Sequence, residues 1–573
     1  MLGSISGCLL TALTLTSVVA RSQSHTIRHK FSKHLKPKRD LVERSTGFHA
    51  VYKRQDDTIN ADITNFEVLY MINVTIGTPG QEIGLQLDTG SSDLWVPAQN
   101  STICSPDYYD ACVYGSYNLS NSSTYRNVPE FGPFFIAYVD GTTIDGTFFN
   151  DTINIDGISI EGATMAVAED DTRGLGLMGV SFTESEYSNL PGRQEANLGP
   201  SFTYPTVLDN MLAQGHILSR SYALWLDDLN DPASTGTILF GGVDTEKYMG
   251  QLVSLPIQID SQTGTRSTFT VAWTGLEVTT GSSSPNTDFS PASPQPVILD
   301  SGTTLTYLPD DIVESIFQGF GVLTDPDAGN IVPCTLVANN YTFVYSFGGV
   351  GGPRISVPLS ELLLPLYNPY TGDIESDSSV FNGAPICQFG IDKAGGNPML
   401  LGDTFLRSAY VVYDLDNFEI ALAQTNFQAT PDANSADVNI ISASAGIPDV
   451  VSTASGASVE QTFTGLPSLG GGATATGTAN TDFGDYGSTT VFRSASFDFS
   501  TSGTVPASAA EAVATGSSRS SSATRTSAIP TSGGTSSGNA ATASSTSAAG
   551  DLRKSEWQVL VGCLIALVVV HLR

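Results

Sequence analysis

Short alternating runs of apolar residues fill the chain between residues 60 and 427, separated by turns rich in Gly, Pro, Asn and Asp. Examples are residues 70–76, 237–240 and 410–413, each followed by Gly or Asp. Alternation with a period of two is typical of half-buried β-strands, and few stretches here have helical period. The pattern therefore predicts an all-β region.

A strand-and-turn pattern occurs twice in this region. The copies are Leu85-Gln86-Leu87-Asp88-Thr89-Gly90-Ser91 and Val297-Ile298-Leu299-Asp300-Ser301-Gly302-Thr303. About a hundred residues after each copy comes an apolar element with Gly, at residues 176–179 and 400–403. The 212-residue interval between Asp88 and Asp300 therefore indicates a repeat of a whole lobe.

The two aspartates are candidate catalytic residues. One Asp-Thr-Gly alone could be an ordinary turn, but two matched copies suggest a pair of carboxyl groups. Two adjacent carboxyl groups share one proton: the ionised member activates a water, and the protonated member polarises the scissile carbonyl. The residues expected to support them are Thr89, Gly90, Ser91, Ser301, Gly302 and Thr303. In this set the hydroxyls of Ser91 and Thr303 would hydrogen-bond the carboxylates.

These motifs resemble the pepsin family over residues 66–427. Residues 76–81, Ile-Gly-Thr-Pro-Gly-Gln, look like its first strand and turn, and residues 88–96 are a near-complete first active-site motif. The resemblance implies an all-β, bilobal fold with two pseudo-twofold-related, barrel-like lobes and a cleft between them. The expected lobes are 66–243 and 244–428. It also implies a monomeric endopeptidase acting on proteins and peptides, with no cofactor and no metal.

Residues 137–142, Ala-Tyr-Val-Asp-Gly-Thr, look like the flap hairpin that closes over substrate in this family. By resemblance, Tyr138 is the flap tyrosine and Trp95 its hydrogen-bond partner, while Asp140 and Gly141 complete the flap. Val139 replaces a Gly found in many members. An acidic residue at position 140 implies a preference for Lys or Arg on the amino side of the cut. The alternative is that Asp140 only stabilises the hairpin turn, which would leave an apolar specificity.

The ends of the chain are expected to be targeting and processing segments rather than parts of the folded protein. Residues 1–20 are typical of a signal peptide. Residues 21–54 contain ten Lys or Arg but only two acidic residues and end at Lys53-Arg54, which favours a propeptide over a disordered basic tail. The rest of the chain is strongly acidic, with a whole-chain net charge of −32, which argues against nucleic-acid binding.

The carboxyl-terminal region is dominated by Ser, Thr, Ala and Gly. Residues 429–550 predict a glycosylated stalk, and residues 551–573 a removed GPI-attachment signal. The apolar tail, 559–572, is shorter than the ~20 residues that a membrane span requires. This organisation resembles the yapsin-like, GPI-anchored aspartic endopeptidases of fungi. It predicts secretion to the outer face of the plasma membrane, with the cell wall as the alternative destination.

Cysteines and glycosylation sequons agree with a secretory route. Of the three pairings open to four cysteines, the economical one joins Cys104 to Cys112 and Cys334 to Cys387. Six N-x-Ser/Thr sequons are candidate glycosylation sites: Asn73, Asn100, Asn118, Asn121, Asn150 and Asn340.

Other classes of enzyme and the non-enzymatic alternatives explain fewer features of the sequence. Outside the two ends the only histidine is His216, which excludes a typical zinc site or Ser–His–Asp triad. A catalytically silent wall glycoprotein would be expected to lose an active-site Asp, a neighbouring Gly or the flap Tyr, and all are present. A mucin-like adhesin would explain the stalk alone.

Overall fold

The computed structural model describes residues 59–65, 69–105, 112–138, 143–171, 174–189, 200–229, 235–261, 263–280, 286–326, 328–368, 373–429 and 437–452. All of them belong to one compact unit, residues 1–507. None of the described helices is long and apolar enough to cross a membrane. The predicted signal peptide, the propeptide, the GPI signal and the stalk after residue 452 lie outside the described residues.

The predicted all-β fold is confirmed. In the amino-terminal half the strands are β1 (Ile59–Asn65), β2 (Tyr70–Ile76), β3 (Gln81–Asp88), β4 (Leu94–Pro97), β5 (Arg126–Asn127), β6 (Pro133–Ala137), β7 (Thr143–Ile155), β8 (Ile158–Asp171), β9 (Gly176–Gly179), β10 (Ser221–Trp225), β11 (Thr235–Phe240) and β12 (Gly242–Asp244). In the carboxyl-terminal half they are β13 (Tyr248–Pro256), β14 (Thr270–Thr279), β15 (Thr287–Asp288), β16 (Gln295–Leu299), β17 (Thr306–Leu308), β18 (Leu323–Asp325), β19 (Gly329–Pro333), β20 (Thr342–Phe347), β21 (Arg354–Pro358), β22 (Leu363–Pro365), β23 (Ile386–Phe389), β24 (Ile391–Lys393), β25 (Leu400–Leu401), β26 (Ala409–Asp414), β27 (Glu419–Thr425), β28 (Val438–Ile440) and β29 (Val451–Ser452).

The sequence repeat is a structural repeat. In the first half β3 pairs in parallel with β9, which pairs antiparallel with β4. In the second half β16 pairs in parallel with β25, which pairs antiparallel with β17. Each half therefore brings its Asp-containing turn beside the downstream apolar-Gly element, although about a hundred residues separate the two in sequence.

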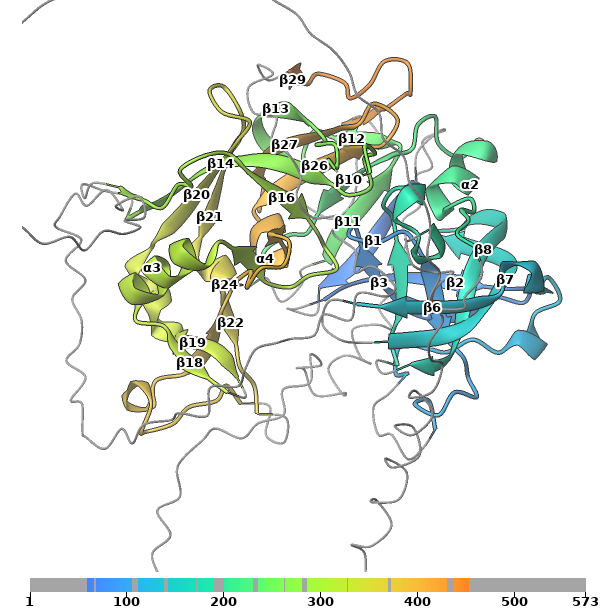
Figure 1. Ribbon diagram of the computed structural model, residues 1–573, viewed down its shortest axis with the longest axis horizontal. Helices are drawn as coiled ribbons and strands as arrows, with labels where there is room; N and C mark the ends of the chain where they lie inside the picture. Colours follow the sequence, from blue (N-terminus) through green and yellow to red (C-terminus); the bar gives the residue numbers. More distant parts are fainter. Residues whose placement is uncertain are drawn as a thin grey trace, which may run out of the picture. The chain divides into compact units, whose positions relative to one another are not determined.

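Strands from the two halves share one sheet. β10 pairs antiparallel with β26, β26 with β27, and β27 with β13 (Figure 1). On the other side of β10 the order continues through β11, β1, β2 and β3 to β9. The largest cluster of buried apolar residues contains residues of both halves.

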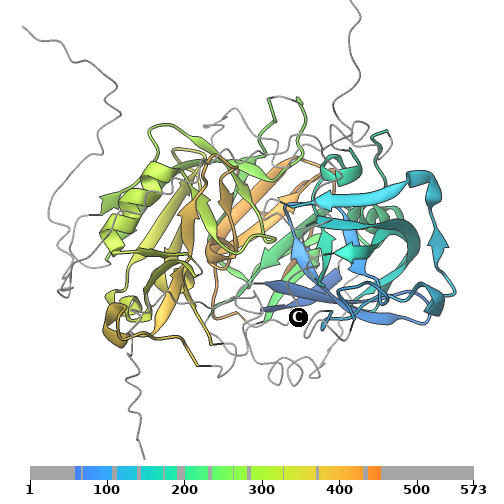
Figure 2. The same cartoon turned by 60° about the horizontal axis from the view of Figure 1, so that its bottom comes forward.

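The described α-helices are short: α2 (Val207–Ala213), α3 (Asp310–Phe320) and α4 (Asp403–Leu406). α3 buries Val313, Ile316 and Phe320, which are spaced to share one helical face. Two aspartates in its first turn and a left-handed Gly321 after its last turn stabilise its ends. The helix covers the strands around β24 (Figure 2).

Two predicted boundaries need correction. β1 begins at Ile59, before the predicted lobe start at 66, and pairs with both β11 and β2. Residues 437–452, predicted to be part of the stalk, pair through β28 with β12 and through β29 with β13. The buried side chains of Ile441 and Ile447 explain why this segment folds although its surroundings are rich in Ser and Ala.

Candidate active site

The two repeated turns bring Asp88 and Asp300 together. Asp88 ends β3, and Asp300 follows β16 directly. Both are nearly buried, with 5% and 8% of their surfaces exposed.

Matching hydrogen bonds hold each carboxyl group. The Gly90 N–H donates to Asp88 Oδ1 at 2.7 Å, and the Ser91 hydroxyl donates to Asp88 Oδ2. The Gly302 N–H donates to Asp300 Oδ1 at 2.8 Å, and the Thr303 hydroxyl donates to Asp300 Oδ2 at 2.5 Å. Each aspartate is therefore fixed by the residues two and three positions after it.

Thr89 and Ser301 lock the two turns to each other. The Thr89 N–H donates to Ser301 Oγ at 3.2 Å, and the Ser301 N–H donates to Thr89 Oγ1 at 2.9 Å. Their hydroxyls donate onward to the backbone oxygens of Leu299 and Leu87, both at 3.0 Å. Buried bonds between segments 212 residues apart fix the separation of the carboxyl groups.

Glycine is required next to each aspartate. A Cβ on Gly90 would lie 2.6 Å from Asp300 Oδ1, and a Cβ on Gly302 would lie 2.3 Å from Asp88 Oδ1. Both distances are too short for real atoms. The turn of each half therefore packs directly against the carboxyl group of the other.

Asp300 favours its protonated form. Burial and the adjacent Asp88 carboxyl raise the pKa of Asp300 to about 7, against the lowering effect of bonds from Thr303 and Gly302. Two carboxyl groups this close repel each other when both are ionised, which favours a pair that holds one proton. Below neutral pH the pair can thus supply both a general acid and a general base.

The flap tyrosine lies where the sequence predicted. Trp95 Nε1 donates to the Tyr138 hydroxyl at 2.8 Å. β6 and β7 form the hairpin that carries Tyr138, with Ala137 opposite Thr143. Asp140 and Gly141, at the tip, lie outside the described residues.

A family model of eukaryotic aspartyl proteases matches residues 69–425. This chain belongs to that family. The match spans both aspartates, the flap and almost all of the described strands, so the chain is a peptidase that acts on proteins.

Relatives of this protease are also named as aspartic endopeptidases or proteinases. A probable aspartic-type endopeptidase, opsB, of Aspergillus fumigatus is 42% identical over 397 residues, which cover 69% of this chain and 76% of the relative. Aspartic proteinase yapsin-3 of Saccharomyces cerevisiae is 32% identical over 371 residues, 64% of this chain and 68% of the relative. Among solved structures, the aspartic proteinase from Irpex lacteus aligns over 66% of this chain and all of its own, with a TM-score of 0.50 and 23% identity. That last similarity supports the pepsin-like fold.

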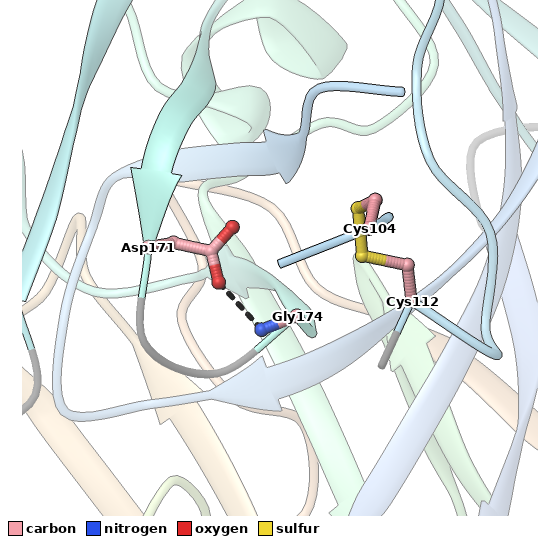
Figure 3. The surroundings of a disulfide bond; sticks show 4 residues. All are labelled: Cys104, Cys112, Asp171 and Gly174. Atoms are coloured by element: carbon pink, nitrogen blue, oxygen red, sulfur yellow. Dashed lines mark hydrogen bonds between the residues drawn. A yellow bond between two sulfur atoms is a disulfide. The ribbon is translucent and has the colours of Figure 1, made fainter. Parts of the chain in front are cut away.

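Both disulfides of the protease have the pairing that the sequence favoured: Cys104–Cys112 and Cys334–Cys387. Figure 3 shows the first one near Asp171 and Gly174 at the end of β8. The Cys112 N–H donates to the Gly174 carbonyl at 3.1 Å, and the Gly174 N–H donates to Asp171. This disulfide loop therefore supports the base of the hairpin β7–β8.

The sequons differ in accessibility. Asn73, Asn100, Asn121 and Asn340 are exposed, and Asn73 lies within β2, as expected. Asn118 and Asn150 are half-buried, and Asn118 also caps a short helix. The exposed group is therefore the better set of glycosylation candidates.

Some residues that support the site were not found from the sequence. Gln86 Nε2 donates to the Gly302 carbonyl at 3.0 Å, from one repeat to the other. Glu361 and Arg407 form a fully buried ion pair of 2.7 Å. A polar residue within a buried strand is a usable signal for Gln86, but the partner of Arg407 becomes visible only in the fold. No cluster of potential metal ligands occurs among the described residues.

Proposed function

We propose that Asp88 and Asp300 are the catalytic pair of this aspartic endopeptidase and that it works at acidic pH. The observation that supports this most is the pair itself: two nearly buried carboxyl groups held by matching donors on turns that are locked to each other, with the pKa of Asp300 raised to about 7. A carboxyl pair with a purely structural role would not need a matching hydroxyl donor on each side or a flap beside it.

The mechanism follows from the asymmetry of the pair. Asp300 holds the proton and donates a hydrogen bond to the scissile carbonyl oxygen. Asp88 accepts a proton from the attacking water, so that the water oxygen bonds to the carbonyl carbon. Asp300 passes its proton to the carbonyl oxygen, which completes a neutral diol. The C–N bond then breaks: the leaving amine takes the proton held by Asp88, and one diol hydroxyl returns its proton to Asp300 as the new carboxyl group forms.

Asp88→Asn and Asp300→Asn should each reduce kcat by at least about 10³-fold without unfolding the protein, because an amide can neither carry nor remove the proton. The measurement is turnover of a quenched peptide from pH 3 to 8, with circular dichroism as the fold control. In the wild type, activity should fall as pH rises through the raised pKa of Asp300, since deprotonation removes the general acid. Retention of a tenth of the activity in either variant would contradict the assignment.

A preference for basic residues on the amino side of the cut is the finer part of the proposal. Asp140 follows the flap tyrosine by two positions. Asp145 on β7 of the flap and Glu169 on the neighbouring strand β8 are exposed acidic residues. A substrate Lys or Arg would be attracted by this charge, whereas an apolar preference would make no use of it.

We also propose that the enzyme is secreted and held by a GPI anchor. The order of small residues 547–550, polar spacer 551–558 and apolar tail 559–572 supports this. The two disulfides support passage through an oxidising compartment.

A further inference from the structure

A second pair of buried carboxyl groups lies beside the active site. Asp93 and Glu186 both have no exposed surface. Asp93 follows Asp88 by five residues, in the loop that leads into β4. Glu186 lies between two short 3-10 helices, η3 (Thr183–Ser185) and η4 (Tyr187–Asn189).

Tyr204 links the two carboxyl groups. Its hydroxyl donates to Asp93 Oδ1 at 2.5 Å, and its backbone N–H donates to Glu186 Oε2 at 2.9 Å. The Tyr187 N–H donates to the other oxygen of Asp93 at 2.8 Å. The second oxygen of Glu186, Oε1, is buried and accepts no hydrogen bond from a described residue.

Among the described residues, the charged groups that raise the pKa of Glu186 are Asp93 and Asp209. Burial and the charge of Asp93, and to a smaller extent that of Asp209, raise the pKa of Glu186 to about 10, against lowering by Tyr204 and Ser188. Arg220 pairs with Asp209 and with Asp416. Glu186 therefore keeps a proton over the working pH range.

The cluster contacts the groups that bind and cleave substrate. The Asp93 carbonyl accepts from the Gly179 N–H at 2.9 Å, and Gly179 is the partner of Asp88 across β3 and β9. Two residues after Asp93, Trp95 holds the flap tyrosine. Tyr204 packs in the same aromatic cluster as Trp95, against which Tyr138 rests.

We propose that Asp93 and Glu186 are positioning residues, which hold the Asp88 loop and the flap tyrosine in their working arrangement only while one proton remains between the two carboxyl groups. If Glu186 leaves the cluster, its pKa returns to its ordinary value near 4.5. The population of the loosened arrangement, relative to the intact cluster, then increases up to tenfold for each pH unit above that value. The flap therefore loosens at a lower pH than the pH at which Glu186 would ionise within the intact cluster.

Glu186→Gln is the direct test, because glutamine keeps the shape and cannot ionise. Since the flap closes over substrate, wild-type KM should rise between pH 4 and 6.5 while the KM of the variant rises less, with similar kcat in both. The inference rests on the proposed catalytic pair, so the other measurements use the inactive Asp300→Asn protein. In Asp300→Asn, the urea concentration at the unfolding midpoint should decrease as pH rises. The decrease should be smaller when Glu186→Gln is added.

Infrared spectroscopy detects the proton itself. In Asp300→Asn at pH 6.5, the protonated-carboxyl absorption should lose the component of Glu186 when Glu186→Gln is added, while the component of Glu361, whose pKa is raised to about 7, remains. Asp151→Asn is the matched control, since Asp151 is buried in the same lobe but hydrogen bonds lower its pKa. It should retain both the Glu186 component and the wild-type pH slope of unfolding.

Asp93→Asn provides a second variant should Glu186→Gln fold poorly. It keeps an acceptor for Tyr204 but removes the charge, so the pH slope of unfolding should again flatten. Equal slopes in the parent and both variants, or a protonated-carboxyl absorption left unchanged by Glu186→Gln, would overturn the proposal. Failure of Asp88 and Asp300 as the catalytic pair would instead leave the slopes and the absorption as expected.

Discussion

Three buried carboxyl groups of this protease, Asp300, Glu186 and Glu361, have raised pKa values, with burial as the first cause. Glu361 reaches only about 7, because Arg407 opposes the effect of burial. A carboxyl group whose pKa is raised on folding stabilises the fold below its unfolded pKa, and this stabilisation is lost as pH rises through the folded pKa. For Glu361 this window is about pH 4.5 to 7. These single residues therefore already adapt the enzyme to acid.

The proposed preference for basic residues before the cut depends on a single residue, Asp140. Asp140→Thr should reduce kcat/KM for peptides with Lys or Arg before the cut by about 10–100-fold, because an ion pair of a few kcal/mol is removed. Peptides with Phe or Leu at that position should be cut about as before. Cleavage profiles of a peptide library measure both. Asp145→Asn, an exposed charge on β7, is the control and should have a smaller effect.

Equal loss of both kinds of cleavage in Asp140→Thr would make Asp140 a hinge of the flap. The enzyme would then be expected to have an apolar specificity.

At the level of elements, the carboxyl-terminal segment 437–452 extends the fold beyond the family match, which ends at residue 425. β28 adds to β12, and the Ile441 N–H donates to the Gly241 carbonyl at 2.9 Å. Ile441 and Ile447 pack with Trp225 and Tyr410 in a separate apolar cluster. The catalytic unit therefore includes residues 437–452.

Truncation after residue 436 should lower the free energy of unfolding by at least about 3 kcal/mol, since burial of an aliphatic side chain contributes about 1.5–3 kcal/mol. Truncation after residue 452 keeps β28 and β29 and is the matched control, expected to be as stable as the longer protein. Urea unfolding of both proteins measures the difference. Equal midpoints would show that the segment contributes nothing to stability.

At the level of the whole molecule, charge is divided between a basic segment, 21–54, and an acidic remainder. We propose that residues 21–54 are a propeptide, whose positive charge would be attracted to the acidic enzyme at neutral pH and less so as carboxylates become protonated. The long Ser- and Thr-rich tract would then hold the catalytic unit away from a membrane surface. Both ends would thus control where and when the same active site works.

Truncation at Asn539 should release the enzyme into the medium, because it removes the small residues, spacer and tail of the anchor signal. A phosphatidylinositol phospholipase should release the full-length form from cells. Immunoblots of cell and medium fractions measure both. A protein that resists the phospholipase and still contains the 559–572 peptide would have a transmembrane tail.

The sequence by itself determined the fold class, the repeat and the positions of both aspartates, because each depends on a local pattern: alternation, a small-residue turn and its second copy. Local patterns also predicted the pairing within Cys104–Cys112, where the loop is short. They misjudged residues 437–452, whose few apolar residues gain stability only against Trp225 and Tyr410.

Only the tertiary structure decided which groups share protons. Asp93 and Glu186 are 93 residues apart in the sequence and belong to no repeated motif. Glu361 and Arg407 are also distant in the sequence, and no local sequence pattern predicts that they form an ion pair. The pKa of a carboxyl group depends on burial and on charges brought near it by folding. A sequence therefore shows which side chains can carry a proton, and the packing of distant segments decides which of them do.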